Sequence, residues 1–174
     1  INVYSDGAVK TPADRFFALS GFGIWWPNRR VDDIIEEGWA AELRRYTVWE
    51  QHTNGTAMFP PLHGSWHTST RAELAALVLA IHCKVPICIG IDNKTVVDKA
   101  CRLIDIADEI ERGTRRQRRR VLGKHWELQS DGGLWKALWE ALRERGASTV
   151  RVRKVKGHAT DEQVEQGVVQ RADK

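Results

Sequence analysis

The chain has 174 residues, of which 42% are hydrophobic and 29% charged, and its 27 Lys and Arg against 23 Asp and Glu give a net charge of +4. This length and composition are ordinary for a globular protein with one substantial apolar core. No apolar run is long enough to span a bilayer and no secretory signal peptide is recognisable, so we expect no membrane partner.

The first part of the chain predicts three strands separated by turns. They are expected at residues 1–9, 19–27 and 53–59. The first alternates apolar and polar residues, the second ends at Pro27, and the third begins beside an Asn54-Gly55 turn of the kind found in hairpins. The acidic stretch 31–45 predicts a short helix. Residues 31–66 are longer than a simple hairpin meander requires, so we interpret them as an insertion or an extended hairpin region.

The rest of the chain alternates helices with strands. Helices are predicted at residues 69–84, 93–113 and 131–146, and strands at residues 85–92 and 148–157. The run VPICIGID at residues 85–92 is almost continuously apolar, which is typical of a strand buried on both faces. Trp135 and Trp139 lie beside leucines at helical spacing and are expected in the core. This order of elements predicts one α/β domain over residues 1–174 with a mixed central sheet.

Three acidic residues occupy positions where an unpaired charge is costly to bury. Asp6 follows the apolar part of the first strand, Glu73 lies on the apolar face of a helix, and Asp92 ends the most buried strand. Each has a local explanation. Asp6 could bond its own turn, and Asp92 could cap the next helix. Thr70 and Glu73 could form a capping box.

A shared explanation covers all three carboxylates. A central strand, the helix packed on it and the end of the next strand can converge on one point, where three carboxylates repel unless a cation lies among them. Carboxylate oxygens favour hard cations such as Mg²⁺ or Mn²⁺. Two such ions can clamp the attacking and leaving oxygens of a phosphoryl displacement, so this pattern predicts phosphodiester chemistry.

Five short segments occur in an order typical of one protein family. They are YSDGA on the first strand, TSTRAELAAL on a helix, IGIDNKTVV at a strand end, DGGLWKAL opening a helix, and VRKVKGHAT near the end. Together they make nearly the whole chain resemble ribonuclease H of the cellular and retroelement type. The resemblance implies a ribonuclease-H-like fold, in which three early antiparallel strands and later parallel strands form a mixed sheet flanked by helices. It also implies hydrolysis of the RNA strand of an RNA/DNA hybrid with two Mg²⁺ ions, for which Mn²⁺ can substitute.

The resemblance assigns roles to individual positions. The metal-binding carboxylates of the family fall on Asp6, Glu73 and Asp92, and its mobile loop histidine falls on His158, with a role in proton transfer or product release. The implied contacts to the hybrid are Gly7, Ala8, Thr68, Ser69, Thr70, Arg115, Arg116, Arg118, Arg119, Arg120 and Lys124. The first two would approach RNA 2′-hydroxyls and the three hydroxyl residues the minor groove. The basic run would grip the DNA strand, although by itself it is equally typical of a solvated face or a localisation signal.

The fourth carboxylate of the family is where this chain departs from the pattern. The family carries it in an Asn-x-x-Ala-Asp motif, and here Ala172-Asp173 follows Val169, which stands where Asn is usual. The interval from His158 is also longer than in the compact cellular enzymes. Two alternatives stay open. Asp173 is the fourth metal ligand and a catalytic residue, or it precedes a truncated motif and the last helix is missing.

Two hypotheses of function follow from the sequence. The first is a metal-dependent endonuclease that cuts the RNA strand of RNA/DNA hybrids and leaves 5′-phosphate ends. The second is a catalytically inactive module of the same fold, which binds nucleic acid or protein within a reverse transcriptase or ribonucleoprotein assembly.

Cys83, Cys88 and Cys101 lack the spacing of a disulfide framework or a zinc cluster. We therefore expect an intracellular location, and the sequence does not separate nucleus, cytoplasm and organelle.

Overall fold

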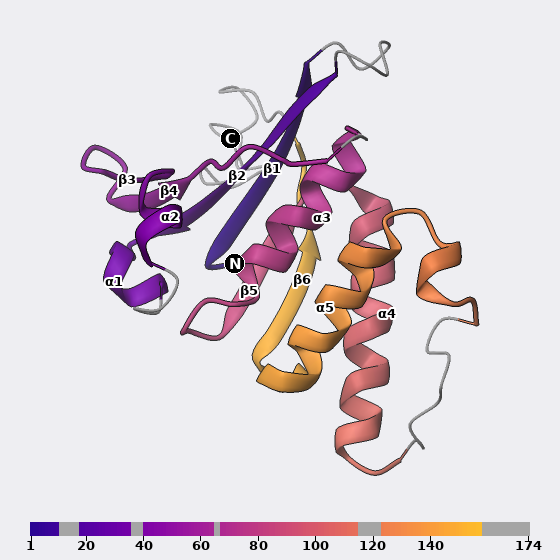
Figure 1. Cartoon of the computed structure of the whole chain (residues 1–174). Coiled ribbons are helices and arrows are strands. Elements are labelled where there is room, and N and C mark those ends of the chain that lie inside the picture. Colours follow the sequence, from indigo (N-terminus) through magenta and orange to yellow (C-terminus); the bar gives the residue numbers. More distant parts are fainter. Residues whose placement is uncertain (11–17, 36–39, 65–66, 115–122, 158–174) are drawn as a thin grey trace.

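The computed structural model describes residues 1–10, 18–35, 40–64, 67–114 and 123–157, and a mixed sheet lies at its centre (Figure 1). The strands are β1 (Val3–Lys10), β2 (Leu19–Pro27), β3 (Thr47–Glu50), β4 (Gly55–Met58), β5 (Ile87–Ile91) and β6 (Val150–Lys154). Their order in the sheet is β3-β4-β2-β1-β5-β6. The first four strands pair antiparallel, whereas β5 pairs parallel with both β1 and β6. This arrangement confirms the predicted fold class.

Strand β3 is an element that the sequence did not predict, and it makes the antiparallel part four-stranded. It pairs with β4 at the edge of the sheet, with Thr47 opposite Met58. Its sequence, TVWE, contains good strand formers, but a run of four residues is too short to reveal a period. The single helix expected at residues 31–45 is two short helices, α1 (Val31–Ile34) and α2 (Ala40–Arg44). Whether residues 31–66 are an insertion stays a prediction.

Three long helices lie on the same side of the sheet, as Figure 1 shows. They are α3 (Ser69–Ala80), α4 (Lys94–Glu111) and α5 (Gly132–Arg145), and two short 3-10 turns, η2 (Trp126–Leu128) and η3 (Ala147–Thr149), precede and follow α5. The three helices confirm the predicted ones, with ends that differ by a few residues. The Gly146 N–H donates to the Leu142 carbonyl at the end of α5, where Gly146 has a φ of 94° that favours glycine.

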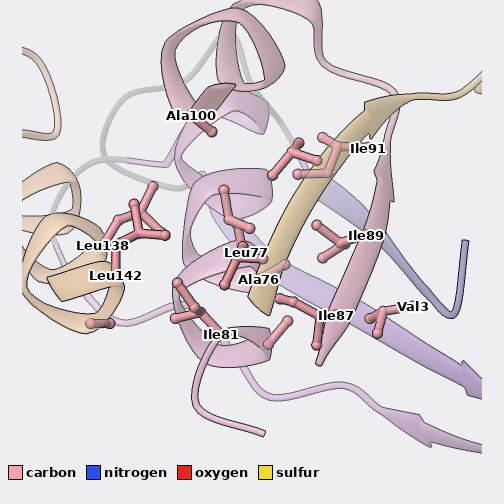
Figure 2. Close-up of a cluster of buried hydrophobic side chains, with 14 of the residues drawn as sticks. Val3, Ala76, Leu77, Ile81, Ile87, Ile89, Ile91, Ala100, Leu138 and Leu142 are labelled. Atoms are coloured by element: carbon pink, nitrogen blue, oxygen red, sulfur yellow. The ribbon is translucent and has the colours of Figure 1, made fainter. Parts of the chain in front are cut away.

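The apolar core lies between this layer of helices and the sheet (Figure 2). Leu77 of α3 and Ile81, which caps the C-terminal end of α3, belong to this core together with Ile89 of β5 and with Leu138 and Leu142 of α5. Trp135 and Trp139 of α5 are buried as predicted. The described residues contain no helix that is both long and apolar enough to cross a bilayer. The core thus holds α3 against the centre of the sheet, where β1 and β5 run side by side.

Gly7 of β1 lies at the closest approach between the sheet and α3. A Cβ atom at this position would lie 2.8 Å from the Ala72 Cβ and 3.0 Å from the Glu73 backbone nitrogen. Both atoms belong to or adjoin the helix backbone, so neither can move away without displacing α3. A residue without a side chain is therefore required here for the helix to reach this depth.

We predict that Gly7→Ala destabilises the protein by about 1–3 kcal/mol, because the added methyl group forces α3 away from β1. The matched control is Gly133→Ala, at an exposed position of α5 where no described atom lies within 4 Å of the added Cβ. This control should be neutral or stabilise by up to about 1 kcal/mol, since alanine favours a helix. Urea unfolding in EDTA measures both changes. Equal stability of the two variants would contradict the close approach.

Candidate metal centre

Three carboxylates from three elements meet at one end of the α3–β1–β5 contact. Asp6 lies in β1, Glu73 in α3, and Asp92 directly after β5, and each offers a carboxylate oxygen within 4.8 Å of the others. The parallel register of β1 and β5 pairs Tyr4 with Gly90, so two residues further along these strands Asp6 and Asp92 are level. The structure brings together the three residues that the sequence singled out. Their role as metal ligands stays a prediction.

Two hydrogen-bond donors on β1, a backbone N–H and a side-chain hydroxyl, hold the Glu73 carboxylate. The Gly7 N–H donates to Glu73 Oε1 over 2.8 Å, and the Ser5 hydroxyl donates to Oε2 over 3.0 Å. Only 2% of the Glu73 surface is exposed, whereas Asp6 is exposed and Asp92 half-buried. Ser5 and Gly7 alternate with Asp6 along β1, so one strand supplies both the exposed carboxylate and the donors that anchor the buried one.

The local explanations of Glu73 and Asp92 are wrong. The cap of α3 is Thr68, whose side chain accepts from the Arg71 N–H, so Thr70 and Glu73 do not form a capping box. The cap of α4 is Asn93, whose side chain accepts from the Val96 N–H. The Asp92 carboxylate is therefore not used to begin its helix. Asp6 lies inside β1 opposite Gly23, within the ladder rather than in a turn.

The electrostatics of the cluster are those of uncompensated negative charge. The pKa of the Glu73 carboxyl is raised from its ordinary value of 4.5 to about 7. Burial is the largest cause, the Ser5 hydrogen bond opposes it, and the nearby Asp92 and Asp6 charges and a hydrogen bond with the Asp92 side chain add to the rise. Within the described part of the chain, no Lys or Arg forms an ion pair with these three residues. A cation among the carboxylates would supply the missing charge.

The donor set fits a hard divalent cation. All three side chains offer carboxylate oxygens, one carboxylate is anchored by two hydrogen bonds, and the other two reach the surface. Mg²⁺ and Mn²⁺ bind through such oxygens and retain some of their own water, which requires a site open on one side. A pocket of about 330 Å³ opens there, lined by Asp6 and Asp92 together with Tyr4, Trp25 and Phe59.

The loop after β6 closes against the Asp92 carboxylate. A Cβ atom on Gly157 would lie 2.1 Å from Asp92 Oδ2, so a side chain here would displace the carboxylate. Lys156, one residue earlier, is exposed and lines the same pocket. The predicted residues His158 and Asp173 lie outside the described residues, so their position relative to the cluster stays a prediction.

The sequence did not single out Ser5, Asn93 or Gly157 as residues of this site. The signal for Gly157 was present, because it directly precedes the histidine of the KGHA segment. Ser5 and Asn93 carry no such signal, since hydroxyl and amide side chains are common beside turns and helix ends. Their role depends on which groups the fold brings near them.

The predicted contacts to nucleic acid lie near the cluster only in part. Thr68 and Ser69 are exposed at the start of α3, and Ala8 is exposed on β1. The Gly7 N–H, expected near a 2′-hydroxyl, is already donated to Glu73. Lys124 is exposed and its carbonyl accepts from the Gln129 side chain. Arg115, Arg116, Arg118, Arg119 and Arg120 lie outside the described residues.

Comparison with known proteins supports the fold. No protein-family model and no curated protein matches the sequence. Among solved structures, the chain is similar to the solution structure of the PFV RNase H domain, with a TM-score of 0.50 and 17% identity. The similarity covers 96% of this chain and 87% of that one. The chain therefore has a ribonuclease-H-like fold.

The raised pKa of Glu73 predicts a pH-dependent stability in the metal-free protein. Because the folded-state pKa of about 7 exceeds the ordinary 4.5, folding favours the protonated carboxyl. This contribution, about 3 kcal/mol, is fully present below pH 4.5 and is lost as the pH rises through about 7. Urea unfolding in EDTA at several pH values measures it, and Glu73→Gln should flatten the profile. The exposed Glu140→Gln serves as the control, and an unchanged slope in Glu73→Gln would contradict the prediction.

Proposed function

We propose that the protein is a metal-dependent endonuclease that hydrolyses the RNA strand of RNA/DNA hybrids by a two-metal-ion mechanism. The observation that carries this proposal is the cluster of Asp6, Glu73 and Asp92 on three different elements, one of them buried and strongly perturbed. A ribonuclease-H-like fold adds support, as does the RNase H domain named among the solved structures. A buried carboxylate without a cation lowers stability, so its presence favours a functional site over a structural one.

Different residues of the chain have different roles in this proposed reaction. Asp6, Glu73 and Asp92 would hold the cations, and the Gly7 N–H and the Ser5 hydroxyl fix both oxygens of Glu73 for this role. Asp173 is the expected fourth ligand. Bound Mg²⁺ supplies activation of a water and stabilisation of the leaving 3′ oxygen, which yields a 5′-phosphate product. The pocket beside Asp6 and Asp92 leaves these carboxylates accessible to a phosphate of the RNA strand.

Two further groups of residues complete the proposal. His158 directly follows Gly157, and Gly157 contacts Asp92. This closeness in the chain supports a proton-transfer role for His158. Thr68 and Ser69 are exposed one turn from Glu73, where they can contact the minor groove of the hybrid. The basic residues at positions 115–120, with Lys124, provide positive charge for the DNA strand. The hybrid is the proposed substrate, and an assembly with a reverse transcriptase stays a prediction.

We predict that Asp6→Asn and Asp92→Asn each lower hybrid cleavage in Mg²⁺ by more than about 100-fold. Mutation of residues that only hydrogen-bond to metal ligands already lowers metal affinity or activity about 10–100-fold, and loss of a ligand itself should cost more. Hybrid binding should persist. The control is Asp98→Asn, an exposed residue of α4 paired with Lys94, which should cleave at the wild-type rate. A labelled RNA/DNA hybrid measures cleavage, with double-stranded DNA and single-stranded RNA as further substrates. Wild-type cleavage by either site variant would overturn the proposal, whereas hybrid binding without cleavage by the wild type would favour the inactive module.

The basic run predicts salt-dependent binding. In Arg119→Gln/Arg120→Gln, the slope of log K for hybrid binding against log salt should fall by about 0.7–0.9 for each phosphate that the protein no longer neutralises. The matched control removes two exposed charges elsewhere, in Lys84→Gln/Lys136→Gln. This control should keep the wild-type slope. Fluorescence anisotropy with a labelled hybrid at several salt concentrations measures the slopes, and equal slopes in both variants would show that the run does not contact phosphate.

A further inference from the structure

A side-chain hydrogen bond joins two helix starts beside the carboxylate cluster. The Asn93 side-chain nitrogen Nδ2 donates to the Thr70 hydroxyl Oγ1 over 3.1 Å, in a half-buried position. The orientation of the Asn93 amide follows from its cap, because its oxygen accepts from the Val96 N–H and its nitrogen must then face Thr70. Asn93 therefore makes two separate interactions, one within α4 and one across to α3.

The position of this bond relates it to two of the carboxylates. Thr70 lies in the first turn of α3, three residues before Glu73 and on the same side of the helix. Asn93 directly follows Asp92. The bond thus connects the backbone segment that carries Asp92 with the helical turn that precedes Glu73.

Forces at the two ends of α3 differ. Toward its C-terminal end, Leu77 and Ile81 pack with the isoleucines of β5 in the apolar core (Figure 2). At the other end, the Asp6, Glu73 and Asp92 carboxylates are like charges held close together, with one oxygen of each within 4.8 Å of the others. Such charges push α3 and the Asp92 segment apart, and a hydrogen bond between those two segments opposes the separation.

Glu73 and Asp92 are therefore positioned by different means. Glu73 is bound to β1 through the Gly7 N–H and the Ser5 hydroxyl, which fixes it relative to Asp6 on the same strand. Asp92 lies beyond the last residue of β5, where the strand ladder no longer constrains it. Besides the contact with Gly157, its distance from Glu73 depends on how the start of α4 is held against α3.

We infer that Asn93 and Thr70 are positioning residues of the metal centre, whose hydrogen bond sets the separation of the Glu73 and Asp92 carboxylates and with it the affinity for a divalent cation. The inference rests on the metal centre of the proposed function. It also changes the expected role of Thr70, whose hydroxyl oxygen is directed to Asn93 rather than wholly toward a nucleic-acid strand.

Binding of Mn²⁺ alone, followed by electron paramagnetic resonance, tests the inference without any substrate. Thr70→Val removes the acceptor at nearly constant shape, and Asn93→Ser removes the donor while leaving an oxygen to cap α4. Each should weaken Mn²⁺ binding by about tenfold, the lower end of the range for residues behind metal ligands. Thr70→Ser retains the hydroxyl and should bind Mn²⁺ nearly as the wild type does. Thr114→Val, which removes a hydroxyl bonded to the Glu109 carbonyl after α4, is the matched control and should leave binding unchanged.

A double variant separates positioning from general loss of stability. If the two side chains act through one bond, Thr70→Val/Asn93→Ser should bind Mn²⁺ no more weakly than the weaker single variant. Urea unfolding in EDTA reports stability for every variant. Wild-type Mn²⁺ affinity in both single variants overturns the inference, even where stability falls. A wild type that binds Mn²⁺ but leaves the hybrid uncut contradicts the proposed function alone, and a wild type that binds no Mn²⁺ contradicts both.

Discussion

The structure depends on one carboxylate that is buried where a helix meets the central strand. Glu73 reaches the Gly7 N–H and the Ser5 hydroxyl only because α3 lies almost against β1. That approach requires a glycine at position 7 and small side chains such as Ala72 on the facing helix. The two donors satisfy the Glu73 oxygens but bring no positive charge, so the cost of burying the negative charge stays and appears as a raised pKa.

The topology of the sheet determines which other charges share that environment. Because β1 pairs parallel with β5, the ends of these strands bring Asp6 and Asp92 to the same level, above the Glu73 turn of α3. An antiparallel neighbour would have placed the end of its strand at the opposite edge. The change from antiparallel to parallel pairing at β1 therefore brings the three carboxylates together. Strand β6 also pairs parallel with β5, and the loop that follows β6 packs Gly157 against Asp92.

The apolar core and the carboxylate cluster have opposite effects on the contact between the same elements. The core draws α3, β5 and α5 together through fully buried residues such as Leu77 and Ile89. The carboxylates act against this at one end, and the hydrogen bonds of Ser5, Gly7 and Asn93 lie at that end. Stability lost at a functional site in this way is commonly offset by packing elsewhere in a domain. A divalent cation would offset the repulsion among the carboxylates, so cation binding should stabilise this end of the fold.

Local patterns in the sequence determined the order of the main elements, the buried run of β5 and the three acidic residues, because strand and helix periods and costly charges are visible in short segments. Tertiary structure alone decided what those residues contact. Thr68, Ser69 and Thr70 all suit a helix cap, and Asp92 and Asn93 both suit the next one. In the packing of the folded chain, Thr68 and Asn93 are the residues that cap the two helices. The same packing gave Ser5, Asn93 and Gly157 their places beside the carboxylates and paired the short β3 with β4. These contacts join residues far apart in the chain, and no local pattern records them.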